Sequence, residues 1–319
     1  MQPALAPAAG PLVQLEAASV AYGRLTAVDA VSLDIRSGET IGLIGESGSG
    51  KSSLARLLVG LVKPSAGRVL FDGHDPARLG GAARLKFRRD VQMIFQDPVA
   101  SLSPRMTIGR LLAEPLQIHG IDRAQAWPGV LELLRRVSLP ETILGKFPHQ
   151  VSGGQARRVG IARALVLHPR LVVADEPTAG LDVSVQGDLV NLMTELQRDF
   201  GLTYLLVSHN LNVVRAMADR FAVLYLGQVV ETGPARQIVA APAHPYTKAL
   251  FAATPRLDPS RSHPPALLEG EIPNPTDLPP GCRFQTRCPF ADDHCRAVEP
   301  PPQMLADGRT VRCHKPLAG

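Results

Sequence analysis

The chain has 319 residues, of which 45% are hydrophobic, so it is long enough for about two domains and can bury a large core. Its net charge is +5, and its basic residues are scattered, without the clustering or aromatic interleaving of a nucleic-acid surface, so we expect no nucleic-acid partner. No apolar run approaches the ~18 residues of a membrane span, and the N-terminal MQPALAPAAGP lacks the features of a secretory signal, so we expect a cytosolic protein.

Strand-like and helix-like segments alternate along the first 250 residues or so. The predicted strands have alternating or continuously apolar patterns and lie at 13–20, 31–35, 68–71, 91–96, 171–175, 203–207 and 220–226. The predicted helices lie at 106–137, 155–167, 182–199 and 210–218. Because strands and helices alternate, we expect an α/β fold with a mostly parallel sheet covered on both faces.

Residues 45–52 read GESGSGKS and form a complete phosphate-binding loop motif. Apolar Ile41, Leu43 and Ile44 precede it like a strand, and leucines at helical spacing follow it, which is the context that such a motif requires. The loop glycines let backbone N–H groups approach phosphate oxygens, Lys51 can reach the β- and γ-phosphates, and Ser52 can hold Mg²⁺. The residues expected to contact the nucleotide are Gly45, Glu46, Ser47, Gly48, Ser49, Gly50, Lys51, Ser52 and Ser53.

A helical stretch interrupts the alternation after Gln96. The stretch from about 99 to 155 is helix-like but contains Pro104, Pro115, Pro128 and Pro140, and we expect it to form an inserted helical subdomain. Gln96 follows a predicted strand and so lies at the edge where ligands bind in open α/β sheets. We expect its amide to bind Mg²⁺ or the attacking water.

The subdomain ends with the string VSGGQ at residues 151–155. Taken alone, Ser152, Gly153, Gly154 and Gln155 would be a helix N-cap with two loop glycines. The string stands shortly before the apolar run LVVADEP, and this combination favours a functional role.

Four further side chains are candidates for work at a bound nucleotide. Asp175 ends a buried strand and suits Mg²⁺ coordination, while Glu176 can polarise a water that attacks the γ-phosphate. His209 ends another strand, where it could sense the γ-phosphate, and Tyr22 could stack on adenine. Asp182 could cap the helix that follows it or line a subunit contact.

Together these motifs resemble the ATP-binding cassette (ABC) family of transporter ATPases. The matches are Tyr22 for the adenine-stacking loop, 45–52 for Walker A, Gln96 for the Q-loop, 151–155 for the signature, 171–176 for Walker B with the catalytic Glu176, 179–182 for the D-loop and His209 for the switch histidine. The resemblance implies a P-loop NTPase fold with a mixed sheet, an antiparallel β subdomain and the helical subdomain. It also implies ATP and Mg²⁺ as cofactors, catalytic roles for Lys51, Gln96, Glu176 and His209, and a signature that closes over the ATP of a second subunit.

Two motifs depart from the usual pattern of the family. The signature begins with Val151 instead of Leu and continues with Ala156-Arg157-Arg158, and the D-loop reads AGLD. We expect no catalytic loss from these changes, although Gly180 would loosen the D-loop.

The region from residue 244 onward resembles the C-terminal extension of ATPase subunits from oligopeptide, dipeptide and nickel importers, on the strings HPYTKAL, LEGEIPNP, LPPGCRF and RCPFADDHC. The resemblance implies a second ATPase subunit (a copy or a paralogue), two transmembrane permease subunits and an extracytoplasmic substrate-binding protein. It places the chain peripherally on the cytoplasmic face of the inner membrane. The expected division is 1–10 as a flexible N-terminus, 11–253 as the nucleotide-binding domain and 254–319 as an irregular extension. Peptide uptake is the expected role, with a nickel-chelate or opine importer, or an accessory ABC ATPase, as alternatives.

All four cysteines lie in this extension: Cys282, Cys288, Cys295 and Cys313. Disulfides are uncommon in cytosolic proteins, and the close pair typical of zinc sites is absent. Four thiolates can hold a [4Fe–4S] cluster, which the resemblance also suggests, while zinc and plain thiols remain open. Because no ATP-site motif lies in the extension, we expect ATP hydrolysis to persist without the cluster.

Overall fold

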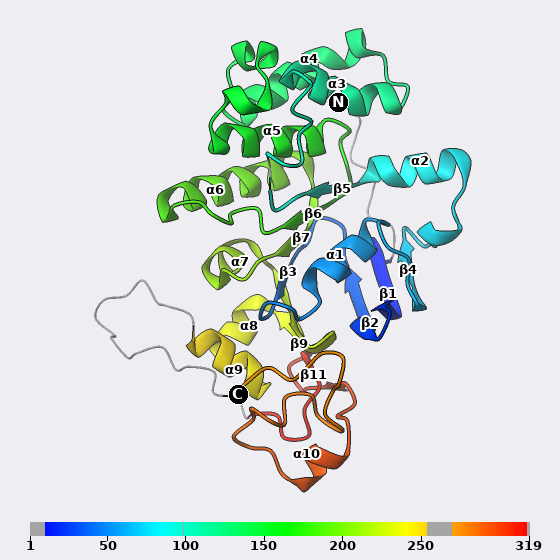
Figure 1. Ribbon diagram of the computed structural model, residues 1–319, viewed down its shortest axis with the longest axis vertical. Helices are drawn as coiled ribbons and strands as arrows, with labels where there is room; N and C mark the ends of the chain where they lie inside the picture. The colour runs from blue at the N-terminus through cyan, green and yellow to red at the C-terminus, as the bar shows by residue number, and fades with distance from the viewer. Residues whose placement is uncertain (1–9, 98, 254–269, 318–319) are drawn as a thin grey trace.

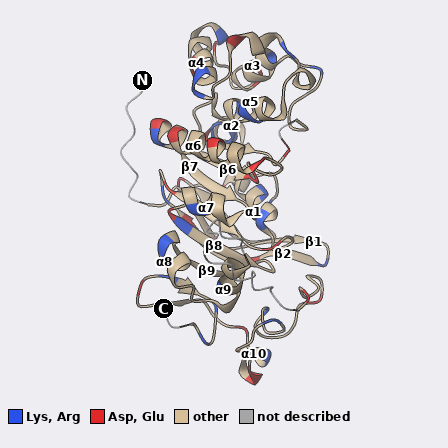
Figure 2. Cartoon of the chain, turned by 90° about the vertical axis from the view of Figure 1, so that its left-hand side faces the viewer, with Lys and Arg blue, Asp and Glu red and all other residues tan. Residues whose placement is uncertain are grey.

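The computed structural model describes residues 10–97, 99–253 and 270–317. Three parts follow one another along its long axis: a helical part, a central sheet with covering helices, and a C-terminal part (Figure 1). The same order is visible from the side, where Lys and Arg are interspersed with Asp and Glu on the face shown (Figure 2).

The central sheet of the described chain has eight strands in the order β10-β11-β9-β8-β3-β7-β6-β5. Strands β8, β3, β7, β6 and β5 are parallel, and the others are antiparallel. The bounds are β3 (Thr40–Ile44), β5 (Val91–Ile94), β6 (Leu171–Asp175), β7 (Thr203–Val207), β8 (Arg220–Tyr225), β9 (Gln228–Pro234), β10 (Gln303–Met304) and β11 (Thr310–Val311). The expected mixed sheet and its central strands are confirmed, whereas β9 was not predicted.

The central strands are apolar throughout because both faces of the sheet are covered. In β7, Tyr204 and Leu206 belong to the core shared with the helical subdomain, while Leu205 and Val207 belong to the core around the antiparallel sheet. This two-sided burial explains the unbroken apolar runs. The covering helices include α1 (Lys51–Leu58), α6 (Val183–Phe200) and α7 (Leu211–Met217).

A separate three-stranded antiparallel sheet, in the order β2-β1-β4, packs against α1. Its strands are β1 (Val13–Tyr22), β2 (Leu25–Ile35) and β4 (Ala66–Phe71). The predicted strand at 31–35 is too short, since β2 begins at Leu25. Bulges explain the difference: Ala17 and Ala30 have positive φ angles, and the register shifts there, so the alternating pattern breaks.

The expected helical subdomain is present and lies at one end of the molecule (Figure 1). Its helices are α3 (Ile108–Ile118), α4 (Arg123–Arg136) and α5 (Gly153–Leu165), with short 3₁₀ turns η2 (Glu141–Gly145) and η3 (Pro148–Gln150) between α4 and α5. The predicted helix at 106–137 is two helices, because Gly120 has a φ of 64° and Asp122 caps α4.

The C-terminal extension is irregular, as expected, except for one short helix and two short strands. Most of it is irregular around α10 (Asp293–Ala297), but β11 pairs with β9 and β10 pairs with β11, so the extension continues the central sheet. Thr310 lies opposite Thr232, and Val311 opposite Glu231. Strands of two residues carry too little pattern to be predicted.

Several helical elements were not predicted: η1 (Pro76–Arg78), α2 (Gly81–Asp90), α8 (Ala235–Ala240) and α9 (Pro245–Ala252). Helix α2 is charged and mostly exposed, so it lacks the apolar stripe by which helices are recognised. Within residues 10–97, 99–253 and 270–317, no helix is long and apolar enough to cross a membrane.

Candidate functional site

The phosphate-binding loop connects β3 to α1, as predicted. Gly45 and Gly50 have φ angles of 154° and 105°, and a Cβ on them would lie 2.2 Å from the Leu224 carbonyl oxygen and 2.1 Å from that of Ala27. Only glycine fits at these two points. Gly50 directly precedes α1, so the loop leads into a helix N-terminus, which favours bound phosphate.

The Lys51 ammonium is buried within this loop. Its Nζ donates to the carbonyl oxygens of Gly45 at 2.8 Å and Glu46 at 2.7 Å, and lies 3.4 Å from the Ser49 hydroxyl. Burial lowers the pKa of Lys51, while the nearby Glu176, Asp175 and Glu46 act in the opposite direction. The lysine is therefore placed to exchange loop carbonyls for phosphate oxygens.

Ser52 and Asp175 meet beside the lysine, from α1 and from the end of β6. The Ser52 hydroxyl lies 3.4 Å from Asp175 Oδ1. Burial raises the pKa of Asp175, and the hydrogen bond from Ser52 opposes that rise. A carboxylate and a hydroxyl oxygen at this distance suit Mg²⁺, whose charge would offset the burial of the acid.

Glu176 and His209 also meet, because β6 and β7 are neighbouring parallel strands. The Glu176 carboxylate accepts hydrogen bonds from the His209 backbone N–H at 2.9 Å and from the Ser208 hydroxyl at 3.3 Å, and His209 Nδ1 lies 2.8 Å from it. Glu176 has a φ of 51°, a conformation that costs energy for a non-glycine residue and is frequent at active sites. The acid is thus held firmly at the sheet edge.

The predicted Gln96 and Tyr22 are both accessible. Gln96 follows β5 and is exposed at the same edge of the sheet as Asp175. Tyr22 ends β1, and 44% of it is exposed, so its ring can stack on a base.

The signature residues lie at the start of α5. The Ser152 hydroxyl accepts from the Gln155 N–H at 3.2 Å, and the Gln155 side chain accepts from the Ser152 N–H at 3.1 Å, which forms a capping box. Ser152 and Gly153 are exposed. Helices α5 and α1 lie in different parts of the molecule (Figure 1), so the signature and the phosphate-binding loop do not meet within one chain.

The D-loop corrects one expectation. Asp182 occupies the N-cap position of α6, but its side chain makes no capping hydrogen bond, so the expected cap is wrong. Gly180 has a φ of 71°, which suits glycine, and the neighbouring Ala179 carbonyl accepts from the Arg157 guanidinium at 2.8 Å. This bond ties the signature helix to the D-loop.

The C-terminal extension contacts the phosphate-binding loop, which the sequence patterns did not indicate. The Arg287 guanidinium donates to both carboxylate oxygens of Glu46, at 2.7 and 3.0 Å, and the Glu46 N–H donates to the Tyr246 hydroxyl at 2.8 Å. The extension therefore reaches the nucleotide loop, while the persistence of ATP hydrolysis without a cluster stays a prediction. The nearest signal in the sequence was that Arg287 directly precedes Cys288.

The four cysteines line one small pocket, together with residues that include His314 and Lys315. All four are free, and burial raises the pKa of Cys282 and Cys288 and raises that of Cys313 to about 11. In the part of the chain that the structure describes, no group of three or more His, Cys, Asp or Glu residues is arranged to hold a metal ion. The four cysteines therefore lie around one pocket, as expected, but they do not form a metal site in this structure.

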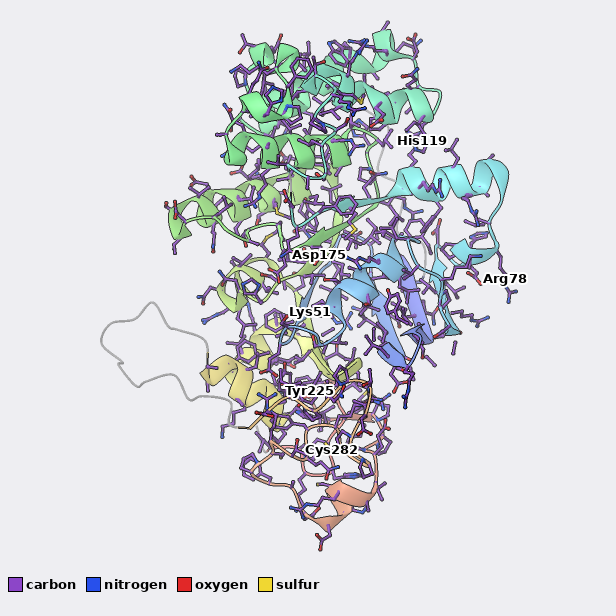
Figure 3. All side chains as sticks on the ribbon, viewed as in Figure 1. Lys51, Arg78, His119, Asp175, Tyr225 and Cys282 are labelled. Atoms are coloured by element: carbon purple, nitrogen blue, oxygen red, sulfur yellow. The ribbon has the colours of Figure 1, made fainter. Side chains whose placement is uncertain are left out.

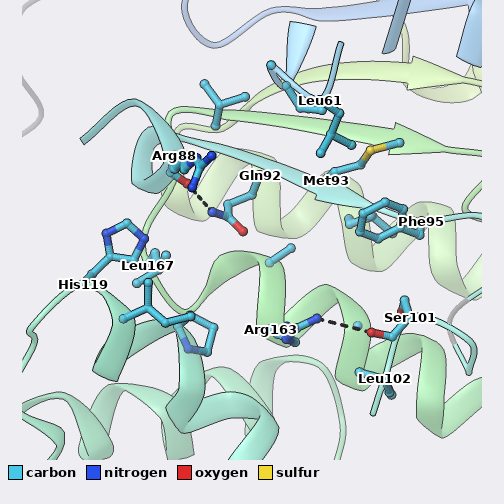
Figure 4. A pocket seen from close by; sticks show the side chains of 18 of the residues that line it. Leu61, Arg88, Gln92, Met93, Phe95, Ser101, Leu102, His119, Arg163 and Leu167 are labelled. Atoms are coloured by element: carbon cyan, nitrogen blue, oxygen red, sulfur yellow. Dashed lines mark hydrogen bonds between the residues drawn. The ribbon is translucent and has the colours of Figure 1, made fainter. Parts of the chain in front are cut away.

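A groove lies between β5 and the helical subdomain (Figure 4). Its wall includes Leu61, Phe95 and Ile118, of which 60%, 45% and 62% are exposed. On the floor, the Arg163 guanidinium lies 3.4 Å from the Ser101 carbonyl oxygen. Exposed apolar side chains around one groove are typical of a surface that binds another protein.

Comparisons with known proteins support the same class of site. The ABC transporter family matches residues 28–179, and the oligopeptide/dipeptide transporter C-terminal region matches residues 230–295. A probable peptide ABC transporter ATP-binding protein of Sinorhizobium fredii is 46% identical over 289 residues, covering 90% of this chain and 82% of that protein. A putative peptide import ATP-binding protein of Brucella abortus is 49% identical over 292 residues, covering 91% and 86%.

Solved structures share the fold. CbiO1 from Clostridium perfringens, part of the ABC transporter complex cbiONQ, is 28% identical with a TM-score of 0.66, covering 72% of this chain and 91% of its own. The ATP-binding cassette MJ0796, in its dimeric post-hydrolysis state with ADP and phosphate, is 32% identical with a TM-score of 0.63, covering 70% and 99%.

The phosphate-binding loop, the two acids and the histidine at one sheet edge, and the capped signature on a helical subdomain define an ABC-type ATPase. The chain belongs to the ATP-binding proteins of the ABC transporter family, in the branch that carries the oligopeptide/dipeptide transporter C-terminal region.

Proposed function

We propose that this chain is the ATP-hydrolysing subunit of a peptide importer. The observation that carries the proposal is the presence, in one chain, of half a composite ATP site and the oligopeptide/dipeptide transporter C-terminal region. Relatives named for peptide import favour peptides over nickel chelates or opines. The C-terminal region speaks against an accessory ATPase.

In this proposal the described contacts serve ATP binding. Lys51 and the loop N–H groups would bind the phosphates, and Ser52, Gln96 and Asp175 would hold Mg²⁺. Bound Mg²⁺ supplies positive charge that neutralises the phosphate oxygens. Tyr22 stacks on the adenine from the end of β1.

Glu176 acts on the attacking water. Its carboxylate orients the water in line with the γ-phosphate and takes its proton, while His209 and Ser208 fix the carboxylate. The signature residues 152–155 and Asp182 of each subunit contact the ATP held by the other subunit. This division explains why the signature is exposed and distant from the loop of its own chain.

The proposed partners are a second ATPase subunit, identical or paralogous, two transmembrane permease subunits and an extracytoplasmic substrate-binding protein. The chain would be peripheral on the cytoplasmic face of the cell membrane. We place the permease contact in the groove of Figure 4, because apolar side chains are exposed there beside the strand that leads to Gln96. A helix of a membrane subunit seated there would sense a change at the ATP site.

The tagged chain, purified in detergent from its source cells, should bring two polytopic membrane proteins with it. Phe95→Asp together with Ile118→Asp should remove them, because charge in the groove opposes burial of an apolar helix. ATP binding by the double variant should stay within about twofold of the unchanged chain, since neither residue is among those assigned to the nucleotide site. Retention of the membrane proteins by the double variant would exclude this groove, and their absence from the unchanged preparation would contradict the importer.

We further propose that the four cysteines hold a [4Fe–4S] cluster. The support is their common pocket, since four thiolates are the ligands that such a cluster requires. The raised thiol pKa values mean that protons must leave as metal binds.

Anaerobically purified protein should therefore be brown and contain about four irons per chain. Cys313→Ser should lose most of the iron, because a hydroxyl replaces a thiolate poorly. Elemental analysis and visible absorbance measure both results. One zinc without iron would favour a zinc site, and four titratable thiols without metal would leave the cysteines as ordinary residues of the extension.

A further inference from the structure

One partly buried ion pair joins the C-terminal extension to the phosphate-binding loop. The two guanidinium nitrogens of Arg287 lie 2.7 and 3.0 Å from the two carboxylate oxygens of Glu46. The side chain of Arg287 is 3% exposed and that of Glu46 21%. A two-point pairing shielded from water fixes the carboxylate in direction as well as in place.

Tyrosines from two other elements complete this contact. The Tyr246 hydroxyl, from α9, accepts the Glu46 N–H at 2.8 Å, and the Tyr225 hydroxyl, from β8, lies 3.4 Å from the Arg287 guanidinium. The two tyrosine rings are 4.6 Å apart, and Phe284 of the extension packs against both. Figure 3 shows Asp175, Lys51, Tyr225 and Cys282 one below another, from the central sheet down to the extension.

The charge of Glu46 is the reason that this contact matters. Glu46 is a member of the loop that would surround the phosphates of ATP. Its carbonyl oxygen accepts a hydrogen bond from Lys51. Its carboxylate is also one of three acids that act electrostatically on Lys51. Without a cation, this carboxylate would repel bound phosphates and compete with them for Lys51.

We propose that Arg287 is a positioning residue of the nucleotide site, through which the C-terminal extension holds Glu46 away from the phosphates. Arg287 acts through Glu46 and does not touch the nucleotide. The ATP site of this chain is therefore complete only when the extension is docked. The proposal rests on ATP binding by the chain.

The test measures MgATP affinity and hydrolysis by the full-length chain. Arg287→Met should weaken MgATP binding about tenfold or more and raise KM by a similar factor, while kcat changes little, because the acid that acts on water is untouched. Adding Glu46→Gln to Arg287→Met should restore most of the affinity, since a neutral amide needs no cation. Arg287→Lys keeps the charge, so its MgATP affinity should lie between that of the unchanged chain and that of Arg287→Met.

A matched control is Arg309→Met. Arg309 is another buried arginine of the extension, paired with Glu231 beneath β11, and no contact of it with the loop is present in the described structure. Its loss should leave MgATP affinity unchanged.

Two results would overturn the proposal. One is an unchanged MgATP affinity in Arg287→Met or, if that variant does not fold, in the neutral variant Arg287→Gln. The other is equal weakening by Arg287→Met and Arg309→Met without rescue by Glu46→Gln, which would make Arg287 a support of the fold alone. A wild-type chain that binds no MgATP would contradict the ATPase assignment itself, so the two failures are distinguishable.

Discussion

Glu176→Gln is expected to abolish ATP turnover while ATP binding remains. The amide keeps the shape of the side chain and can still accept from the His209 N–H, but it cannot take a proton from water. Loss of a general base costs on the order of 10²–10⁴-fold in rate, so single-turnover hydrolysis should fall by at least about 100-fold. Binding should change by less than about threefold, since Glu176 does not hold the loop.

Glu195→Gln is the matched control for this variant. Glu195 is an exposed acid on α6, and its replacement should leave the rate unchanged. Near-normal single-turnover hydrolysis by Glu176→Gln would show that another group activates the water.

Lys51→Ala is expected to weaken both ATP binding and hydrolysis. The lysine is the buried cation of the loop, and each charged hydrogen bond that it would make with a phosphate contributes about 1.5–3 kcal/mol. The dissociation constant for MgATP should therefore rise roughly 10- to 100-fold, measured by calorimetry at fixed Mg²⁺.

Lys63→Ala serves as the control, because Lys63 is exposed just beyond α1 and lies outside the loop. A thermal unfolding curve separates lost affinity from a lost fold, since Lys51 also bonds to loop carbonyls. An unchanged dissociation constant in a folded Lys51→Ala protein would remove this lysine from the phosphate site.

The parts of the site that could be predicted depend on short-range geometry. Lys51 and Ser52 follow a strand and a glycine loop, so their position is set by residues beside them. Glu176 and His209 come together because each ends a strand and the two strands are parallel neighbours. The order of strands and helices was enough to place both pairs.

The contacts that could not be predicted join distant segments without a repeating pattern. Glu46 and Arg287 are 241 residues apart, and neither lies in an alternating or helical stretch that would reveal a partner. The pairing of β11 with β9 likewise depends on two residues in each strand. For Asp182 the sequence predicted a contact that the structure lacks. It has a suitable residue type at the N-cap position of α6, but its side chain makes no capping hydrogen bond.

The most direct test of the proposed role is ATP-driven peptide uptake. The purified complex of this chain with its membrane subunits is reconstituted in proteoliposomes, the substrate-binding protein and a labelled oligopeptide are supplied on the outer side, and MgATP is enclosed. We predict that the peptide accumulates inside, and that Glu176→Gln stops accumulation while the complex stays assembled. Failure of the wild-type complex to accumulate any peptide, or equal uptake by Glu176→Gln, would contradict the proposal.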